Sequence, residues 1–310
     1  MTISNTKKMR TFLGYVALLS FFGVSGFVIG SLQELQPRAD KVDQLAGAVA
    51  TLELNNDFTD LSVTADAAYV LDISSGERLF EKNGQAQLPL ASITKAALAL
   101  LADKHLKENG VITFSERNLL PEGDSGFEVG ETWNVRELID FTLMTSSNDG
   151  ASALAEAIEN ATGSDIATLL NELAKDLGLS QTYFVNETGL DSNELFSGAY
   201  GSAQDVATLF TYVYKTAPDL LAATTMNERA FTSADGKTYK AINTNKGVSD
   251  LPGLVFGKTG FTDLAGGNLV VVTESEPGHP FATVVLGSTL IDRFDDVVTL
   301  VRATLQEPPK

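Results

Sequence analysis

The chain has no cysteine, only two histidines and a single tryptophan among its 310 residues. The absence of cysteine excludes thiol nucleophiles, thiolate metal sites, disulfide bonds and lipid attachment through an N-terminal cysteine. Basic residues are also scarce, since 22 Lys and Arg stand against 40 Asp and Glu for a formal charge of −18. Because so negative a body repels phosphate backbones, we expect no binding to nucleic acid.

Motifs for metal, nucleotide and dinucleotide binding are missing as well. The sequence contains no HExxH, no EF-hand loop, no P-loop and no GxGxxG after a strand, so we expect no cofactor and no metal. Neither histidine suits a serine triad with Ser92. His105 would lie about 20 Å from Ser92 along the same helix, and His279 lies in the turn sequence PGHP. We interpret both histidines as surface or cap residues.

The chain has one long uncharged run, residues 11–32. As a helix this run would be about 33 Å long, which matches the hydrocarbon thickness of a bilayer. Lys7, Lys8 and Arg10 precede it and acidic residues follow from Glu34, so the positive-inside rule places the N-terminus in the cytoplasm. We expect a single-pass membrane anchor with the rest of the chain outside the cell membrane. The alternative is a cleaved signal peptide, which would leave a secreted protein.

The remaining sequence divides into a tail, a stalk, a body and a frayed end. Residues 1–10 form the expected cytoplasmic tail, residues 33–64 a stalk or linker, residues 65–306 the globular body, and residues 307–310 a short tail. In the stalk, apolar residues recur at helical spacing in KVDQLAGAVATLEL. This pattern predicts a surface helix or a spacer, with coiled-coil pairing as the alternative.

The order of elements in the body predicts its fold class. AAYVLDI and ERLFEK flank the turn-forming Ser74-Ser75-Gly76 and predict a β-hairpin. Helical patterns with capping-box starts at Asn134 and Ser202 fill the middle, and strand patterns return after Pro252, followed by a closing helix. We therefore expect an α+β fold, with one antiparallel sheet built from both chain ends, flanked by helices, and an inserted helical region.

The first candidate for chemistry is a serine with a lysine one helical turn later, Ser92-Ile93-Thr94-Lys95. This spacing places Oγ and Nζ on the same helix face. At a helix start, the serine N–H also points outward and can bind an oxyanion. Taken alone, the S-x-x-K pattern is weak, and the plain interpretation is a serine that caps a buried helix.

Two further motifs change that interpretation. Ser146-Ser147-Asn148 lies between two expected helices, and Lys258-Thr259-Gly260 ends a strand-like run. S-x-x-K, then S-D-N, then K-T-G is, in this order, the signature of penicillin-binding proteins and class A β-lactamases, and this chain has S-x-N in place of S-D-N. Each motif retains a plain alternative, because S-x-N can cap a helix and a lysine can protect an edge strand from aggregation.

Longer stretches carry the same resemblance. LPLASITKAAL, EGDSGFEVGE, LMTSSNDGASALAEA, NETGLD, GSAQDVATL and FGKTGFTDLAGGNLV resemble the serine D-alanyl-D-alanine carboxypeptidases, the low-molecular-mass penicillin-binding proteins of the S11-type peptidase family. The resemblance covers about Ala65 to Gln306 and implies a serine β-lactamase/transpeptidase-like fold. Many relatives continue into a C-terminal β-rich domain and an amphipathic anchor, so here we expect the N-terminal segment to serve as the anchor.

The resemblance implies a catalytic role for four residues. Ser92 is the expected nucleophile and Lys95 its base, which requires a depressed lysine pKa. Ser146 is expected to relay a proton toward the leaving amine, and Asn148 to hold Lys95 and a substrate amide. The hydrolysis would proceed through an acyl-enzyme on Ser92.

Four more residues are expected to bind the substrate, a peptidoglycan stem peptide that ends in D-Ala-D-Ala. Lys258 and Thr259 would bind the terminal carboxylate, and Gly260 would let the strand approach a ligand closely. The oxyanion would lie between the N–H groups of Ser92 and Phe261. Phe261 departs from the family, in which a polar side chain often follows K-T-G, but only its N–H is needed. Thr262, Asp263, Asn186 and Gly189-Leu190 match family positions and are expected to form turns and walls. β-Lactam antibiotics are the expected inhibitors.

Other activities share these residues. A transpeptidase or DD-endopeptidase would use the same site on crosslinked peptides. A class A β-lactamase would need a water-activating glutamate, usually in an E-x-x-L-N loop, and that string is absent. A catalytically inactive wall-binding module is the remaining alternative, and it is disfavoured because all the catalytic polar residues are present.

Overall fold

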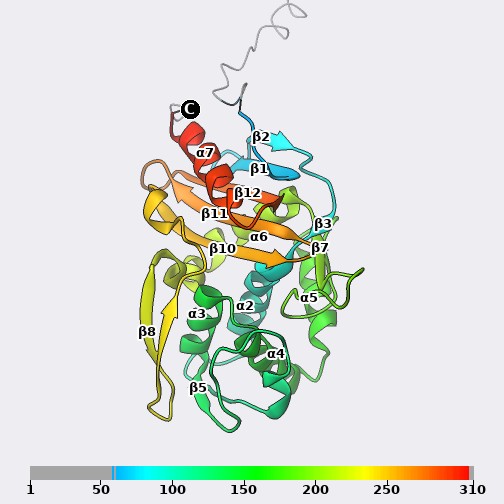
Figure 1. Cartoon of the computed structure of the whole chain (residues 1–310), viewed down its shortest axis with the longest axis vertical. Helices are drawn as coiled ribbons and strands as arrows, with labels where there is room; N and C mark the ends of the chain where they lie inside the picture. The colour runs from blue at the N-terminus through cyan, green and yellow to red at the C-terminus, as the bar shows by residue number, and fades with distance from the viewer. Residues whose placement is uncertain (1–57, 59–60, 307–310) are drawn as a thin grey trace, which may run out of the picture. The chain divides into compact units, whose positions relative to one another are not determined.

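The computed structural model describes residues 58 and 61–306 (Figure 1). The expected tail at residues 1–10, the anchor at 11–32, most of the stalk at 33–64 and the end at 307–310 lie outside the described residues. Among the residues that are described, no helix is long and apolar enough to cross a membrane.

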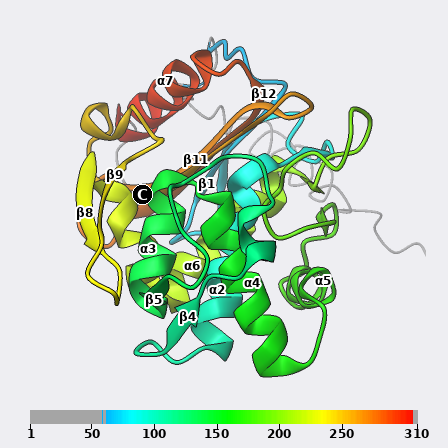
Figure 2. The same ribbon diagram turned by 60° about the horizontal axis from the view of Figure 1, so that its bottom comes forward.

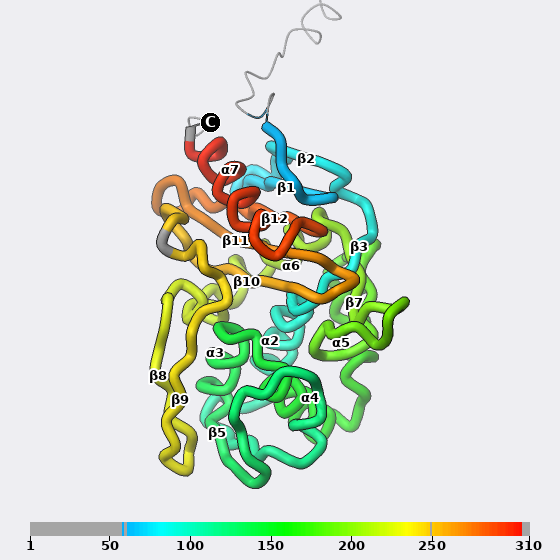
Figure 3. Tube along the Cα trace, in the orientation of Figure 1, coloured from blue at the N-terminus to red at the C-terminus, as the bar shows by residue number. Residues whose placement is uncertain are grey.

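A five-stranded antiparallel sheet joins the two ends of the body. Its strand order is β10-β11-β12-β1-β2. Strands β1 (Ala67–Asp72) and β2 (Arg78–Lys82) form the predicted hairpin, and β10 (Leu254–Thr262), β11 (Gly266–Glu274) and β12 (Pro280–Ser288) follow the predicted C-terminal strands. Strand β1 pairs with β12 in the register Ala67↔Leu286. The tube in Figure 3 shows this meeting of early and late segments. The predicted α+β fold class is confirmed.

Alternation along the strands gives the sheet two apolar faces. On one face, Tyr69, Val270 and Val284 belong to the large core that includes α2 (Thr94–His105) and α6 (Ala203–Thr216). On the other face, Val271 and Val285 pack with the closing helix α7 (Asp292–Gln306). The sheet therefore lies between α7 and the helical region, as Figure 1 shows.

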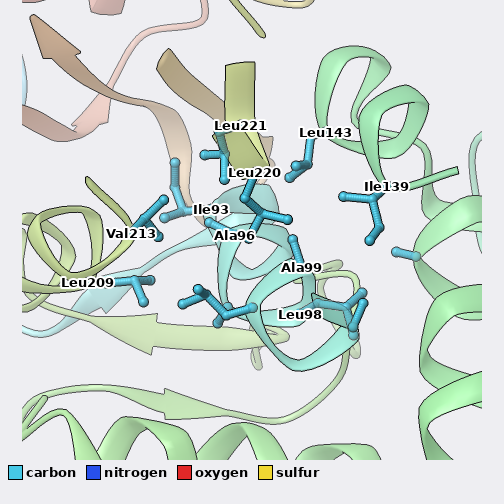
Figure 4. Close-up of a cluster of buried hydrophobic side chains, with 14 of the residues drawn as sticks. Ile93, Ala96, Leu98, Ala99, Ile139, Leu143, Leu209, Val213, Leu220 and Leu221 are labelled. Carbon is cyan, nitrogen blue, oxygen red and sulfur yellow. The ribbon is translucent and has the colours of Figure 1, made fainter. Parts of the chain in front are cut away.

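Helix α2 is the centre of the larger core. Every residue from Thr94 to Ala102 is buried, because neighbours cover the helix on all sides. Figure 4 shows Ala96 and Ala99 of α2 beside side chains of α3 (Val135–Thr145), α6 and the 3₁₀ segment η3 (Pro218–Thr225). Because the helix is packed on every side, side chains in its first turn have little freedom to move.

The inserted region contains the other helices and several small sheets. The remaining helical elements are η1 (Ala91–Ile93), η2 (Glu116–Leu119), α4 (Asn148–Thr162), α5 (Ile166–Asp176) and η4 (Val248–Asp250). The short strands are β3 (Leu88–Pro89), β4 (Val111–Thr113), β5 (Thr132–Asn134), β6 (Tyr183–Phe184), β7 (Ala199–Gly201), β8 (Glu228–Thr232) and β9 (Thr238–Ile242). Figure 2 shows α2 and α4 side by side in this region. The predicted caps form, since Asn134 accepts a hydrogen bond from Arg136 N and Ser202 from Asp205 N.

The packed body begins earlier than residue 65. Phe58 and Val63 are buried, and Leu61 packs beside them in the core under α7. Two backbone N–H groups, those of Thr64 and Ala65, donate to the carboxylate of Asp296 on α7. The last residues of the expected stalk therefore belong to the body, because α7 offers them an apolar surface and a carboxylate.

Candidate active site

Ser92 and Lys95 lie at the junction of η1 and α2. Ser92 is half-buried in η1, and Lys95 lies in the first turn of α2, with Nζ 2.8 Å from Ser92 Oγ. The turn is unusual because Ala91 has a φ of 49°, in the left-handed region that few non-glycine residues adopt. Gly189 packs on the same turn, where a Cβ would lie 2.0 Å from Ala91 O. The chain is thus held in a tight bend that presents the hydroxyl.

The Lys95 side chain is almost inaccessible to solvent. It is 1% exposed, and besides Ser92 it contacts Asn148 Oδ1 and Thr188 O, each at 2.7 Å. Burial lowers the pKa of Lys95 to about 7, against the opposing effect of Glu187. The two carbonyl oxygens can only accept, so they take the two N–H bonds of a neutral amine. The amine lone pair is then left for the Ser92 hydroxyl.

The corner between α3 and α4 supplies the second motif. Ser146 ends α3 in the left-handed conformation, and Ser147 caps α4 by accepting a hydrogen bond from Gly150 N. Since Ser147 does the capping, the side chains on either side of it serve the site. Asn148 reaches Lys95 and donates through Nδ2 to Glu122 O at 2.6 Å, while Ser146 Oγ lies 2.9 Å from Lys258 Nζ.

Strand β10 supplies the third motif at the edge of the sheet. Lys258 is 1% exposed and also donates to Thr259 O. Gly260 allows the strand to approach η1, because a Cβ there would lie 2.8 Å from Leu90 O and 3.3 Å from Ser92 N. The structure therefore brings all three motifs around Ser92.

The backbone of β10 also faces the site. Gly257 N donates to Thr224 Oγ1 and so points away from β11, toward the open edge. The direction of the backbone N–H groups alternates along a strand, so the N–H groups of Thr259 and Phe261 point to that same edge. The Phe261 side chain is 44% exposed at the end of the strand. A backbone N–H thus faces the region beside Ser92, where an extended peptide could add to the edge.

Positive charge is concentrated and poorly solvated here. Burial first, and then the charges of Lys95 and Arg293, hold the pKa of Lys258 well below its ordinary value. Arg293 is itself buried at the start of α7 and donates to Gly260 O at 2.7 Å. The site can therefore attract an anion while keeping at least one amine able to accept a proton.

Several of these contacts were not predicted from the sequence. Arg293, the carbonyls of Thr188 and Glu122, and Thr244, whose hydroxyl contacts Thr259 Oγ1 at 2.6 Å, belong to no catalytic motif. Backbone carbonyls carry no sequence signature at all. The NETGLD stretch was the only available signal for the Thr188 contact.

Two of the predicted turn and wall residues make hydrogen bonds beside the site. Asn186 Oδ1 accepts hydrogen bonds from Thr188 N and Gly189 N, which orients the carbonyl that Lys95 contacts. Thr262 donates to Asp191, tying this loop to β10. The histidines lie elsewhere, since His105 ends α2 and His279 contacts Asp72.

No other centre competes with this one in the described part of the chain. A cavity of about 610 Å³ and another of about 320 Å³ lie near the end of α2, and none of the predicted site residues lines them. Within residues 58 and 61–306, no group of three or more His, Asp or Glu side chains could hold a metal ion.

A serine hydroxyl beside a buried lysine, with a second lysine on an edge strand opposite, defines a serine enzyme of the Ser–Lys type. A family model for D-alanyl-D-alanine carboxypeptidases matches residues 54–289. The chain belongs to this family.

Individual relatives agree with the family. The chain is 29% identical over 250 residues to D-alanyl-D-alanine carboxypeptidase DacF of Bacillus subtilis, covering 78% of this chain but only 62% of the relative. It is 28% identical over 217 residues to a D-alanyl-D-alanine endopeptidase of Pseudomonas aeruginosa, covering 68% and 67%. Penicillin-binding protein D2 of Listeria monocytogenes, solved in a cefotaxime-bound form, superposes with a TM-score of 0.68 at 28% identity, over 80% of this chain and 99% of that one.

Proposed function

We propose that the protein is a serine D-alanyl-D-alanine carboxypeptidase, which removes the terminal D-alanine from peptidoglycan stem peptides and is acylated by β-lactams. One observation carries the proposal: a buried lysine, with its pKa lowered to about 7, lies 2.8 Å from a half-buried serine hydroxyl. A general base works best with a pKa near the operating pH.

In the proposed acylation, neutral Lys95 removes the proton from Ser92 as Oγ attacks the carbonyl carbon of the penultimate D-alanine. The developing oxyanion is stabilised by the N–H groups of Ser92 and Phe261, which act mainly in the transition state. As the C–N bond breaks, Ser146 relays the proton taken up by Lys95 to the nitrogen of the leaving D-alanine, which leaves Lys95 neutral and an ester on Ser92. Because Ser146 Oγ contacts Lys258, that hydroxyl is held in one orientation.

In the proposed mechanism, the K-T-G motif determines the choice of substrate. Lys258 and Thr259 bind the free carboxylate of the last residue, which restricts the enzyme to chain ends. Asn148 holds a substrate amide as well as Lys95. After D-alanine has left, water hydrolyses the ester on Ser92.

Labelling with a fluorescent penicillin tests the assignment of the nucleophile. Ser92→Ala should abolish covalent labelling with the thermal unfolding transition retained. Lys95→Arg should also block acylation, because guanidinium does not deprotonate. Ser147→Ala is a matched control, since this serine caps α4 and does not contact Lys95 or Lys258. Persistent labelling of the Ser92 variant removes Ser92 from the mechanism, and near wild-type rates for Lys95→Arg remove Lys95 as the base.

An endopeptidase is the second candidate, because one relative named above carries that activity in its name. Release of D-alanine from monomeric stem peptides, compared with cleavage of crosslinked dimers, separates the two. We expect D-alanine release to dominate. Faster cleavage of the dimers would favour the endopeptidase, and transfer of the acyl group to an amine would favour a transpeptidase.

We also propose that residues 11–32 anchor the protein in the cell membrane, with the N-terminus in the cytoplasm and the catalytic body outside. The uncharged run and the preceding basic residues support this proposal. Intact-mass measurement of the protein in the membrane fraction tests it. The full-length mass is expected, whereas a mass that lacks the N-terminal segment indicates cleavage and secretion.

A further inference from the structure

Arg293 is a buried cation that has no acidic partner in the part of the chain that the structure describes. It lies in the first turn of α7, is 6% exposed, and takes part in none of the ion pairs among the described residues. Its guanidinium stacks 4.8 Å from the ring centroid of Phe294, and its buried Nε has no hydrogen-bond partner in the described part of the chain. Burying a charge so incompletely paired is costly, so a purely structural position would favour a neutral side chain.

The carboxylate one turn along the helix from Arg293 is committed elsewhere. Asp296, one turn along α7, accepts hydrogen bonds from the N–H groups of Thr64 and Ala65 and from Ser288 Oγ. The only hydrogen bond made by the Arg293 side chain among the described residues runs from Nη1 to Gly260 O, at 2.7 Å. The charge is therefore directed at the K-T-G strand.

Gly260 is the point where β10 touches the nucleophile turn. Its Cα lies so close to η1 that a Cβ would meet Leu90 O and approach Ser92 N. Because backbone direction alternates along β10, the N–H and carbonyl of Gly260 point toward β11 and not toward the open edge. The hydrogen bond from Arg293 to the Gly260 carbonyl therefore ties the residue that touches η1 to helix α7.

We propose that Arg293 is a positioning residue, which holds the Gly260 carbonyl so that the edge of β10 stays against Ser92 and which keeps a permanent positive charge behind Lys258. The inference rests on the proposed function, since it concerns how well the site acylates. Arg293 acts through Gly260 and Lys258.

The charge has a measurable consequence for Lys258. The groups that face this lysine are Lys95 from α2, Arg293 from α7, the Ser146 hydroxyl and the Thr259 carbonyl. Because the guanidinium lowers the pKa of Lys258, its removal raises that pKa. Lys258 then keeps its charge, and its hold on a substrate carboxylate, to higher pH. Arg293 itself stays charged at neutral and mildly alkaline pH, since burial lowers its pKa only to about 10.

The test compares Arg293→Gln, Arg293→Lys and Arg302→Gln, the last being an exposed arginine on the same helix. Acylation by a fluorescent penicillin, which carries a carboxylate, is measured from pH 6 to pH 10, together with kcat and KM for D-alanine release. Arg293→Gln is expected to lose about 10- to 100-fold in acylation rate, as for a small misplacement of reacting groups. The alkaline limb of its pH–rate profile, where acylation falls off, should move to higher pH. Arg302→Gln should match the wild type.

Arg293→Lys provides the rescue arm and guards against misfolding. A lysine lacks the planar fork and, buried at the same place, loses its charge at a lower pH than arginine. Acylation should therefore slow by roughly three- to tenfold, with the alkaline limb between those of the wild type and Arg293→Gln. Thermal unfolding establishes which variants fold, and if Arg293→Gln does not, the lysine variant decides. Wild-type acylation rates in the folded variants overturn the inference. A glutamine variant that is slower at every pH, but whose rate falls at the same alkaline pH as that of the wild type, overturns it as well. A wild-type protein that is not labelled at all contradicts the proposed function instead.

Discussion

Replacing Asn148 with aspartate should move the pH dependence of acylation to higher pH. Asn148 Oδ1 lies 2.7 Å from Lys95 Nζ, so the substitution puts a full negative charge beside the base. An opposite charge at this distance raises a lysine pKa by about 1 to 3 units. Starting from the wild-type pKa of about 7, the neutral fraction at pH 7 falls from about one half to between roughly one tenth and one thousandth.

The assay is the rate of labelling by a fluorescent penicillin between pH 5 and pH 10, and the measured quantity is the midpoint of the acid limb. The aspartate also loses the hydrogen bond from Nδ2 to Glu122 O, which lowers the plateau rate but leaves the midpoint unaffected. Asn148→Ala is the control, because it removes the same hydrogen bonds without adding charge and should not raise the midpoint. If the aspartate variant has the wild-type midpoint or a lower one, Lys95 is not the group that titrates.

Three further predictions follow from the same geometry. Glu187→Gln should shift the acid limb to lower pH in that labelling assay, because the Glu187 carboxylate raises the pKa of Lys95; an upward shift contradicts this. The free energy of unfolding of Lys95→Met should rise relative to that of the wild type as the pH falls from 10.5 toward 7, by up to about 5 kcal/mol in chemical denaturation. In this range the lysine of the unfolded wild type carries a proton that the buried native lysine lacks. A difference between the two proteins that stays constant with pH refutes the prediction. Gly189→Ala should lower the melting temperature by several degrees and slow acylation, because its Cβ would clash with Ala91 O. Gly163→Ala, at a similar positive φ but in open space, is the control for backbone strain alone, and equal effects would exclude the clash.

Much of the fold could be predicted from local patterns. The alternating and apolar strands at both ends indicated one sheet, and polar caps such as Asn134 and Ser202 marked helix starts. The start of the body could not be found in this way. Phe58 and Val63 lie next to a stretch with the helical spacing of a stalk, and only the surface of α7, some 230 residues further along, makes them part of the core.

The site, like the fold, could be predicted only in part from the sequence. Side chains within short motifs, such as Ser92 with Lys95, could be predicted because their chemistry depends on residue type and spacing. The contacts that tune them could not, because Thr188 and Glu122 act through backbone carbonyls that every residue has. Arg293 was missed for another reason: an arginine at the start of a helix that carries acidic residues in its first turn is typical of a surface salt bridge, and only the three-dimensional structure directs it at Gly260.

The pairing of β1 with β12 has a consequence for biosynthesis. A ribosome releases β1 long before its neighbour β12, and the Ala65 N–H finds its acceptor on Asp296 only 231 residues later. Such distant pairings make folding slow. Lys258 and Gly260 belong to the same late strands, so an incomplete nascent polypeptide cannot assemble a reactive serine. The enzyme can therefore mature only once the chain has been synthesised as far as helix α7.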